Sequence, residues 1–264
     1  MLNESSAVKN ERGEKILQEL LRNGEVSVEH LSKRLKISPS TVRRELTELE
    51  RLGLLRRTHG GAVRVEPMLY EPFRHVSSFS AQEQLHTAEK RRIGLAAAEI
   101  IRDGEIIALG AGTTTTQVAR SIRHRKGITV VTNAINIAIE LSYRADLKVI
   151  VTGGTMGGDW FALTGPTAIS AVGEVFYDKV FIGVDGIHLE RGLTTNYPDQ
   201  AAVHRAMMRQ ARQRIVVADH TKIGDIGTAL ICPASDIDLI ITDKGVTPKV
   251  VAQFVAKKIE IRKV

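Results

Sequence analysis

The sequence predicts an α/β protein of two domains: a small N-terminal domain of helices with one hairpin, and a larger C-terminal domain built on a mostly parallel sheet. The first 64 residues hold helical patterns that end in a glycine turn. From residue 105 onward, short apolar strands alternate with Gly/Thr-rich loops and helices. With 264 residues, 43% of them hydrophobic, the chain has enough apolar material for a separate core in each domain.

Two helical patterns open the N-terminal domain. Residues 12–22 have apolar side chains at helical spacing, and Asn23-Gly24 ends the pattern. A second helix follows Ser27, and about three residues separate its end from Ser38. Because so short a turn makes two helices cross steeply, the next helix is expected to stand outward as a ridge.

That next helix, expected between about residues 38 and 53, is the most informative segment of the chain. Ser38 suits its N-cap, Pro39 its first position and Gly53 its end. One narrow stripe is apolar and is expected to be buried. It consists of Val42, Leu46 and Leu49. The opposite face carries hydroxyls and arginines, which are the groups that a recognition helix presents to the major groove of DNA. The alternative for this face is an ordinary solvated surface.

A hairpin is expected after the third helix. Two strand-like runs flank a His59-Gly60-Gly61 turn, which predicts a small wing. Helices and wing together predict a winged helix-turn-helix that binds double-stranded DNA. The residues expected to contact the DNA are Ser38, Ser40, Thr41, Arg43, Arg44, Thr47, Arg56, Arg57, His59 and Gly60.

Positive charge is concentrated in the same segment. Residues 33–64 carry nine Lys and Arg against three acidic residues, a net charge of +6, whereas the whole chain has +7. A local basic patch of this kind attracts the phosphate backbone and predicts salt-dependent binding through counterion release.

Residues 65–80 contain two prolines and a serine pair that interrupt helical patterning. We therefore assign residues 1–64 to the DNA-binding domain, 65–80 to an extended linker and 81–264 to the second domain. The aromatic residues of the linker are expected to pack against the second domain. They are Tyr70, Phe73 and Phe79. A long helix over 81–101 is expected to follow.

The second domain is expected to contain a mostly parallel sheet that helices cover on both faces, because its apolar runs are continuous and alternate with helices. The strands are expected near IIALG, ITVVT, KVIVT, KVFIGV, RIVVA and DLIIT. Ligands of such sheets bind at the carboxyl ends of the strands. The polar loops expected at that edge are 110–116, Thr132-Asn133, Thr152–Gly154, Asp185-Gly186 and Asp219–Lys222.

The loop at residues 110–116, GAGTTTT, suits a phosphate. Its glycines let backbone N–H groups approach a ligand, its hydroxyls add donors, and the following helix N-terminus favours an anion. It lacks the Lys-Ser/Thr of a Walker A loop and the G-x-G-x-x-G spacing of a dinucleotide site, so nucleotide hydrolysis is not expected. A tight strand-to-helix turn without a ligand is the alternative.

The chain resembles the DeoR/GlpR-type bacterial sugar regulators. The resemblance begins with SPSTVRRELTELERLGLLRRTHGGA. It continues through AAAEIIRDGEIIALGAGTTTTQVAR, ITVVTNA, VIVTGG, VFIGVDGI, ADHTKIG and DLIITD, and so covers nearly all 264 residues. It implies operator DNA as one partner and a phosphorylated sugar as the other. It also implies a Rossmann-like sensor domain similar to ribose-phosphate isomerases, in which GTTT holds the phosphate and Asp185, Gly186 and Lys222 line the sugar pocket.

The residues expected to bind the effector are Gly112, Thr113, Thr114, Thr115, Asn133, Gly153, Gly154, Asp185, Gly186 and Lys222. The chain departs from the family pattern at two places. Gly110 stands where many members have an acidic residue, and the segment 200–204, QAAVH, stands where they have a Glu-Ala-Glu-Val-Lys-like helix. The sequence therefore does not identify the sugar.

We expect a regulator, a repressor of a sugar-metabolism operon, and not an enzyme. Isomerases of the similar fold continue the Asp-Gly motif with acids that move protons, whereas Asp185-Gly186 is followed here by Ile-His-Leu. The alternative is a sugar-phosphate isomerase or deaminase with an ancillary DNA-binding domain. Because one winged domain buries little surface, a homo-oligomer, dimer or tetramer, is expected to form through the sensor domains.

Several further classes of protein are not expected. A single cysteine, Cys232, provides no disulfide framework and no zinc cluster, and we expect it to be a buried, inert thiol. The histidines lack the mutual spacing of a metal site, so neither a metal nor a cofactor is predicted. The polar N-terminus and the short apolar runs predict a cytoplasmic protein without a membrane span. Trp160 is expected to have a packing role, with a lid or dimer contact as the alternative.

Overall fold

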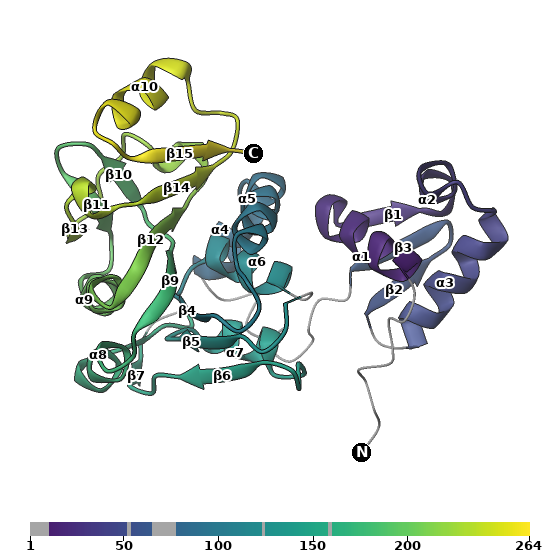
Figure 1. Cartoon of the computed structure of the whole chain (residues 1–264), viewed down its shortest axis with the longest axis horizontal. Coiled ribbons are helices and arrows are strands. Elements are labelled where there is room, and N and C mark those ends of the chain that lie inside the picture. Colours follow the sequence, from purple (N-terminus) through teal and green to yellow (C-terminus); the bar gives the residue numbers. More distant parts are fainter. Residues whose placement is uncertain (1–10, 52–53, 65–77, 123–124, 158–159) are drawn as a thin grey trace. The chain divides into compact units, whose positions relative to one another are not determined.

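The computed structural model describes residues 11–51, 54–64, 78–122, 125–157 and 160–264. The chain divides into two compact units, residues 1–68 and 69–264 (Figure 1). Within the described ranges, the first unit has one hydrophobic core and the second has two. Among the described residues, no helix is long and apolar enough to cross a membrane.

The first unit is a winged helix-turn-helix, as predicted. Its elements are α1 (Glu11–Asn23), β1 (Glu25–Ser27), α2 (Val28–Leu35), α3 (Pro39–Arg51), β2 (Leu55–Thr58) and β3 (Gly61–Arg64). The strands form an antiparallel sheet in the order β1-β3-β2. The sequence did not predict β1, because three residues are too few to show an alternating pattern.

Side-chain caps explain where two of these helices begin. The Ser27 hydroxyl accepts a hydrogen bond from the backbone N–H of His30 (3.1 Å) at the start of α2. The Ser38 hydroxyl accepts one from the N–H of Thr41 (3.2 Å) at the start of α3. Each bond satisfies a donor that the first helical turn leaves free. The predicted apolar stripe of α3, which is Val42, Leu46 and Leu49, is buried in the core of the unit.

The second unit is built on a sheet of seven parallel strands within the described residues. The strand order is β15-β14-β12-β9-β4-β5-β6. Their bounds are β4 (Ile106–Leu109), β5 (Thr129–Thr132), β6 (Lys148–Val151), β9 (Tyr177–Ile182), β12 (Ala211–Val217), β14 (Leu239–Thr242) and β15 (Glu260–Lys263). The six predicted strands are confirmed; β15 was not predicted, because its charged residues hide the strand pattern.

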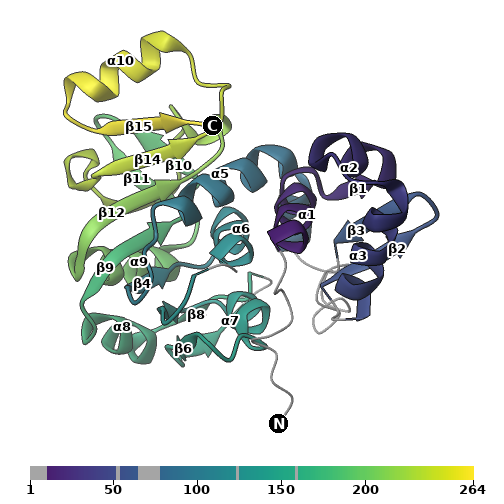
Figure 2. The ribbon, with the colours of Figure 1, turned by 45° about the vertical axis from the view of Figure 1, so that its right-hand side comes forward.

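Helices cover both faces of this sheet, as Figures 1 and 2 show. They are α4 (Ser78–Gln84), α5 (Thr87–Glu99), α6 (Thr113–Ser121), α7 (Ile135–Leu141), α8 (Pro166–Gly173), α9 (Pro198–Arg209) and α10 (Pro248–Ala256). In β12, Ile215 and Val217 pack into the core beneath α5, α6 and α7, whereas Val216 packs into the core beneath α8, α9 and α10. Because side chains alternate between the two faces of a strand, β12 contributes to a separate core on each face of the sheet.

Two smaller sheets lie outside the main one. One is antiparallel and has the order β10-β11-β13, formed by β10 (Gly186–His188), β11 (Gly192–Thr195) and β13 (Ala229–Cys232). The other pairs β7 (Thr155–Met156) with β8 (Leu163–Thr164). Short helical turns lie at His220–Lys222 and Ala234–Asp236.

The prediction of one long helix over 81–101 is wrong. The helix is divided into α4 and α5, and His86 between them has a left-handed backbone with φ of 52°. The Thr87 hydroxyl donates to the carbonyls of Glu83 and Gln84 (3.0 and 2.9 Å), so a side chain satisfies the groups that end α4. Helix α4 also begins inside the predicted linker, at Ser78, and its Phe79 is buried as expected. Residues 65–77, with Tyr70 and Phe73, lie outside the described residues.

Candidate functional site

The exposed face of α3 carries the side chains that were predicted to contact DNA. Ser40, Arg43, Arg44 and Thr47 are exposed, and Thr41 is half-buried. Within the described residues, the guanidinium groups of Arg43 and Arg44 have no hydrogen-bond or ion-pair partner. A cationic helix face of this kind is free to bind a polyanion.

Hydroxyl groups gather at the N-terminus of α3. The Ser38 oxygen lies 2.8 Å from the hydroxyl oxygens of both Ser40 and Thr41. Because Ser38 also caps the helix, this cluster is held in place by the backbone. The positive end of the helix dipole adds to the attraction for a phosphate there.

The wing lies beside α3 and is tied to it. The backbone N–H of Arg57 donates to Glu50 Oε1 (2.8 Å), and Arg57 Nη1 donates to Thr47 Oγ1 (3.0 Å). Thr47 in turn donates to the carbonyl of Arg43 (2.8 Å). Arg57 and Thr47 therefore fix the wing against the helix, a structural role that the sequence did not predict. Arg56, Thr58, His59 and Gly60 of the wing are exposed.

Close packing at Gly61 fixes the wing on its other side. A Cβ atom there would lie 1.8 Å from the carbonyl oxygen of Val26, so β3 approaches β1 as only glycine allows. The carbonyl of Gly60 also accepts a hydrogen bond from the N–H of Val28 (2.9 Å).

A buried carboxylate joins the first two helices. Glu19 on α1 is 5% exposed, and it binds Arg34 on α2 (2.9 Å) and lies 3.4 Å from His30 Nε2. Arg34 therefore contributes to the internal structure of the domain, whereas Arg43 and Arg44 on α3 are exposed.

A pocket opens at the carboxyl edge of the main sheet in the second unit. The segments that line it follow β4 (residues 111–114), β9 (183–185) and β12 (218–222), with further residues from α4, α5, β11 and α9. The chain leaves β4 toward β5 and β6 and later returns as β9 on the other side of β4, so the pocket lies at the point where the strand order reverses.

Five of the ten predicted effector residues line this pocket. They are Gly112, Thr113, Thr114, Asp185 and Lys222. Gly112 is the N-cap of α6, and its carbonyl accepts hydrogen bonds from the hydroxyls of Thr115 and Thr116 (2.9 and 2.8 Å). The pocket thus faces the N-terminus of a helix, where the dipole favours an anion.

The structure does not bring the other five to the pocket. Thr115 and Asn133 are fully buried. Asn133 accepts from the N–H of Ala111 and donates to the carbonyl of Leu163 (both 3.0 Å), so it supports the loop from beneath. Gly186 packs against the backbone of Asp225, and Gly153 and Gly154 shape an exposed turn after the edge strand β6.

Asp185 is held so that one of its oxygens is available. Its Oδ2 accepts from the Thr195 hydroxyl (2.9 Å) and from the N–H of Asn196 (2.8 Å). Its Oδ1 has no partner among the described residues. A carboxylate oxygen in this position can accept a hydrogen bond from a ligand hydroxyl.

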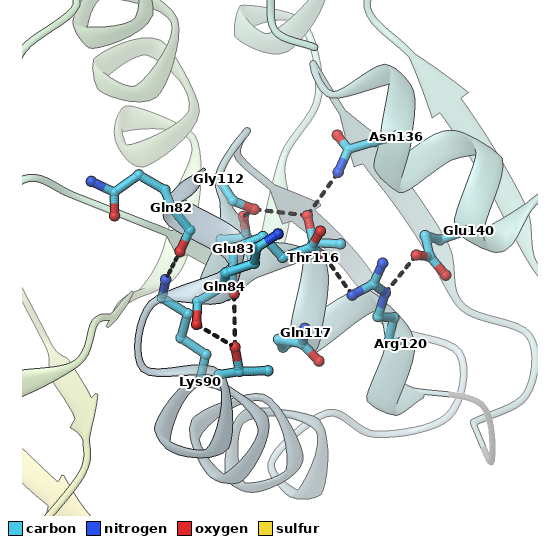
Figure 3. Close-up of polar contacts among 12 residues, drawn as sticks. Gln82, Glu83, Gln84, Lys90, Gly112, Thr116, Gln117, Arg120, Asn136 and Glu140 are labelled. Carbon is cyan, nitrogen blue, oxygen red and sulfur yellow. Dashed lines mark hydrogen bonds and ion pairs between the residues drawn. The ribbon is translucent and has the colours of Figure 1, made fainter. Parts of the chain in front are cut away.

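Lys90 on α5 is the main pocket residue that the sequence did not predict. The residue is 3% exposed, and its ammonium donates to the main-chain carbonyl of Gln82 on α4 (Figure 3). Burial lowers the pKa of Lys90 to about 8, against the opposing influence of the Asp219 carboxylate. The sequence feature that could have indicated its burial is helical spacing, because Lys90 lies on the same helical face as the buried Ile93 and Ala97.

Aromatic and amide groups complete the wall of the pocket. Trp160 and Tyr197 both line it, with ring centroids 5.2 Å apart. Trp160 also packs edge-on against Phe79, so the expected packing role is combined with a place in the pocket wall. Gln200 lines the pocket as well and donates to the carbonyl of Ala111 (2.8 Å).

The two departures from the family pattern contact each other. A Cβ atom at Gly110 would lie 2.7 Å from Nε2 of His204, and the same nitrogen lies 3.4 Å from Gln200 Nε2. His204 is fully buried, and burial lowers its pKa to about 4, so its ring is neutral near pH 7. The missing side chain at Gly110 thus makes room for His204 beneath the pocket.

Within the described part of the chain, no group of three or more His, Cys, Asp or Glu could hold a metal ion. Cys232 is a free, buried thiol, and burial raises its pKa to about 12. A thiol with so high a pKa carries little thiolate and is a poor nucleophile.

Comparison with known proteins identifies a domain family for each unit. Residues 12–68 match a DeoR-like helix-turn-helix domain, and residues 85–244 match the DeoR C-terminal sensor domain. The transcriptional regulator GlpR of Haloferax volcanii is 37% identical over 88% of this chain and 89% of its own length. A putative aga operon transcriptional repressor of Escherichia coli O157:H7 is 34% identical over 89% of this chain and 87% of its own length. The repressor GlcR of Bacillus subtilis is 33% identical over 87% of this chain and 86% of its own length.

Solved structures are more distant. Ribose 5-phosphate isomerase A of Neisseria gonorrhoeae is 17% identical and covers 54% of each chain, with a TM-score of 0.37. A likeness of this degree says nothing about ligand or activity. The relatives that span most of the chain are named regulators and repressors, which confirms the prediction that the protein is not an enzyme. With both domain types matched in order and relatives above 30% identity over most of its length, the chain belongs to the DeoR family of DNA-binding transcriptional regulators.

Proposed function

We propose that this protein is a repressor of a sugar-metabolism operon, that its winged domain binds operator DNA, and that its sensor domain binds a phosphorylated sugar. The observation that carries the proposal is the composition of the pocket. Two lysines, Lys90 and Lys222, line it together with the N-terminus of α6, and Asp185 lines it with one oxygen that has no partner in the described part of the chain. Cations with a helix N-terminus suit a phosphate, and a carboxylate suits hydroxyls.

The phosphate end is assigned to the start of α6. Backbone N–H groups at the first turn of a helix have no internal partner, and Thr113 and Thr114 of that turn line the pocket. Lys90 and Lys222 supply positive charge for a dianionic group.

The sugar end is assigned to Asp185, Thr195 and Gln200, whose side chains can exchange hydrogen bonds with hydroxyls. The rings of Trp160 and Tyr197 provide an apolar surface for the carbon skeleton. A few polar groups set against an apolar wall are typical of small-molecule sites.

The names of the relatives support the transcriptional part. Two of them are named as repressors, and one of these names refers to an operon. The exposed arginines of α3 supply the cationic surface that operator binding needs, with Ser38, Ser40 and Thr41 at its N-terminal end. We propose a dimer or tetramer, because one winged domain buries too little surface for tight specific binding.

Effector and operator act on each other through their preference for two arrangements of the protein. If the sugar phosphate prefers the arrangement that binds DNA poorly, it lowers operator affinity by the ratio of its affinities for the two arrangements. We propose that the sugar phosphate has this preference and therefore acts as an inducer.

The test is a titration of labelled DNA from the protein's own upstream region with purified protein. The titration is repeated with ribose 5-phosphate, glucose 6-phosphate and fructose 1-phosphate. We expect one sugar phosphate to release the DNA. Lys222→Ala should bind the DNA normally and lose the response, whereas Lys249→Ala, an exposed lysine on α10, should respond as the wild type does. A normal response of Lys222→Ala would show that the pocket is misassigned.

A further inference from the structure

Several contacts hold helix α4, and residues of the pocket wall make two of them, one to Phe79 and one to Gln82; Figure 3 shows the second. The Phe79 ring packs edge-on against Trp160, with 6.2 Å between centroids. The carbonyl of Gln82 accepts a hydrogen bond from Lys90. Glu83 forms an ion pair with Arg120 (2.7 Å). A helix of seven residues is too short to be stable alone, so the position of α4 depends on such contacts.

The ion pair of Glu83 belongs to a larger cluster. Arg120 on α6 binds Glu83 through Nη1 and Glu140 on α7 through Nε (2.5 Å), and we call these three residues the arginine clamp. The side chains of Arg120 and Glu140 are 2% and 0% exposed, and that of Glu83 is 12% exposed. Removing one member of a buried ion pair leaves a buried charge uncompensated, which is costly. The clamp therefore holds one side of α4 firmly against α6.

The contact between Lys90 and Gln82 is of a different kind. Its acceptor is an uncharged carbonyl, whereas an ammonium can donate three hydrogen bonds and prefers charged acceptors. Lys90 also lines the pocket, so a phosphate bound there would compete with Gln82 for the same ammonium. Lys222 lines the pocket too, but its ammonium makes no hydrogen bond or ion pair to a described residue of α4.

We propose that α4 transmits ligand binding to the winged domain: an anionic ligand draws Lys90 away from the Gln82 carbonyl, and α4 shifts against the arginine clamp. In the sequence, α4 is the first described helix after the winged unit, so its displacement acts directly on the segment that joins the two. This inference rests on the proposed sugar-phosphate function and names how the same site is coupled to DNA.

The two pocket lysines provide a matched pair of variants. Lys90→Met and Lys222→Met each remove one cation from the pocket, but only the first removes a contact to α4. Without any ligand, Lys90→Met should bind operator DNA about 5- to 150-fold more weakly than the wild type, the usual range of an allosteric coupling. Its affinity should equal that of the ligand-saturated wild type. Lys222→Met should bind operator DNA more tightly than Lys90→Met does, because it leaves the contact between Lys90 and Gln82 in place.

Ligand binding is measured separately, with ribose 5-phosphate, glucose 6-phosphate, fructose 1-phosphate and inorganic phosphate as probes. Trp160 is the only tryptophan and lines the pocket, so its fluorescence is a direct signal. Both variants should bind the probes about tenfold or more weakly, as expected for the loss of a hydrogen bond to a charged group. If neither variant weakens any probe, or if no probe binds the wild type, the proposed function is wrong and the inference fails with it.

The variants could also lose ligand binding while Lys90→Met keeps wild-type affinity for operator DNA. That result would support the ligand site and overturn the proposed role of α4. Hydrogen exchange on the wild-type protein gives an answer that does not depend on a variant folding. The amides of residues 79–84 should exchange faster with a bound sugar phosphate than without it. Unchanged or slower exchange there would overturn the inference.

Discussion

The winged domain and the sensor domain present their cations in opposite ways. Arg43, Arg44 and Arg56 are exposed, and their guanidinium groups have no partner among the described residues. Lys90 is 3% exposed, and its ammonium is hydrogen-bonded to the protein's own backbone. Exposed charges attract any polyanion and are screened by salt, whereas a buried charge is screened little and selects its ligand by geometry. The first arrangement suits a long, uniformly charged polymer and the second suits one small anion.

Salt should separate the two arrangements most strongly. If the winged domains of an oligomer contact six or more phosphates, operator affinity should fall by about 10³-fold or more between 50 and 200 mM salt. Binding of a sugar phosphate to the pocket should change far less, because Lys90 is buried and Lys222 is half-buried. The measurement is the slope of log affinity against log salt for each ligand. Equal slopes for operator DNA and for the sugar phosphate would contradict the proposed difference between exposed and buried cations.

Among the exposed arginines, we expect Arg44 to contact a base. Arg44→Ala should lower operator affinity by about 1–3 kcal/mol and relax the base preference at one position of the operator. The control is Arg92→Ala, which removes an exposed arginine of the sensor domain whose ion-pair partner among the described residues is Glu89 on the same helix. A uniform loss over all DNA sequences would assign Arg44 to a phosphate instead.

The two regions also differ in how far they could be predicted. The DNA-binding surface is continuous in sequence, so helical spacing alone placed Val42 in the core and Arg44 outside. The pocket depends on strand order, which is not a local property. Thr152–Gly154 follows β6, the edge strand, and so lies away from the reversal point between β4 and β9. Asn133 follows β5, directly beside β4, and is covered by the loop that it supports.

Helical spacing could place Lys90 on the buried face of its helix, but not in the pocket, for a related reason. It lies on the helix that precedes the first strand of the sheet, not at the carboxyl end of a strand. Its place in the pocket depends on how α5 packs over the sheet beside α4, and this in turn depends on the break at His86. Apolar runs and loop composition carry no information on either point, whereas they were sufficient for Asp185 and Lys222.

The pH dependence of ligand binding should also separate the two regions. The pKa of Lys90 is lowered to about 8 by burial, and a bound phosphate would raise it by stabilising the ammonium. Ligand affinity should therefore be full below about pH 8 and fall by up to about tenfold per pH unit above it. The phosphate itself, with its second pKa near 6, no longer titrates there.

Two controls accompany this pH series. Lys90→Met should bind weakly, with little change between pH 7 and 10. Operator binding by Lys90→Met should stay constant over the same range, since the guanidinium groups keep their protons. A wild-type ligand affinity that is flat to pH 10 would show that Lys90 is not a ligand of the phosphate.

A last prediction compares packing at one glycine of each region. A Cβ atom at Gly110 would lie 2.7 Å from His204 Nε2 and 3.0 Å from Ile182 Cδ1, whereas one at Gly60 in the wing would meet nothing within 4 Å. Overpacking a core costs about 1–3 kcal/mol, so Gly110→Ala should lower the unfolding temperature of the sensor domain by several degrees. Gly60→Ala should leave it unchanged. Because Gln200 contacts His204 and lines the pocket, Gly110→Ala should also weaken ligand binding. If both variants unfold at the wild-type temperature, the space at Gly110 is not what accommodates His204, and the floor of the pocket tolerates a side chain there.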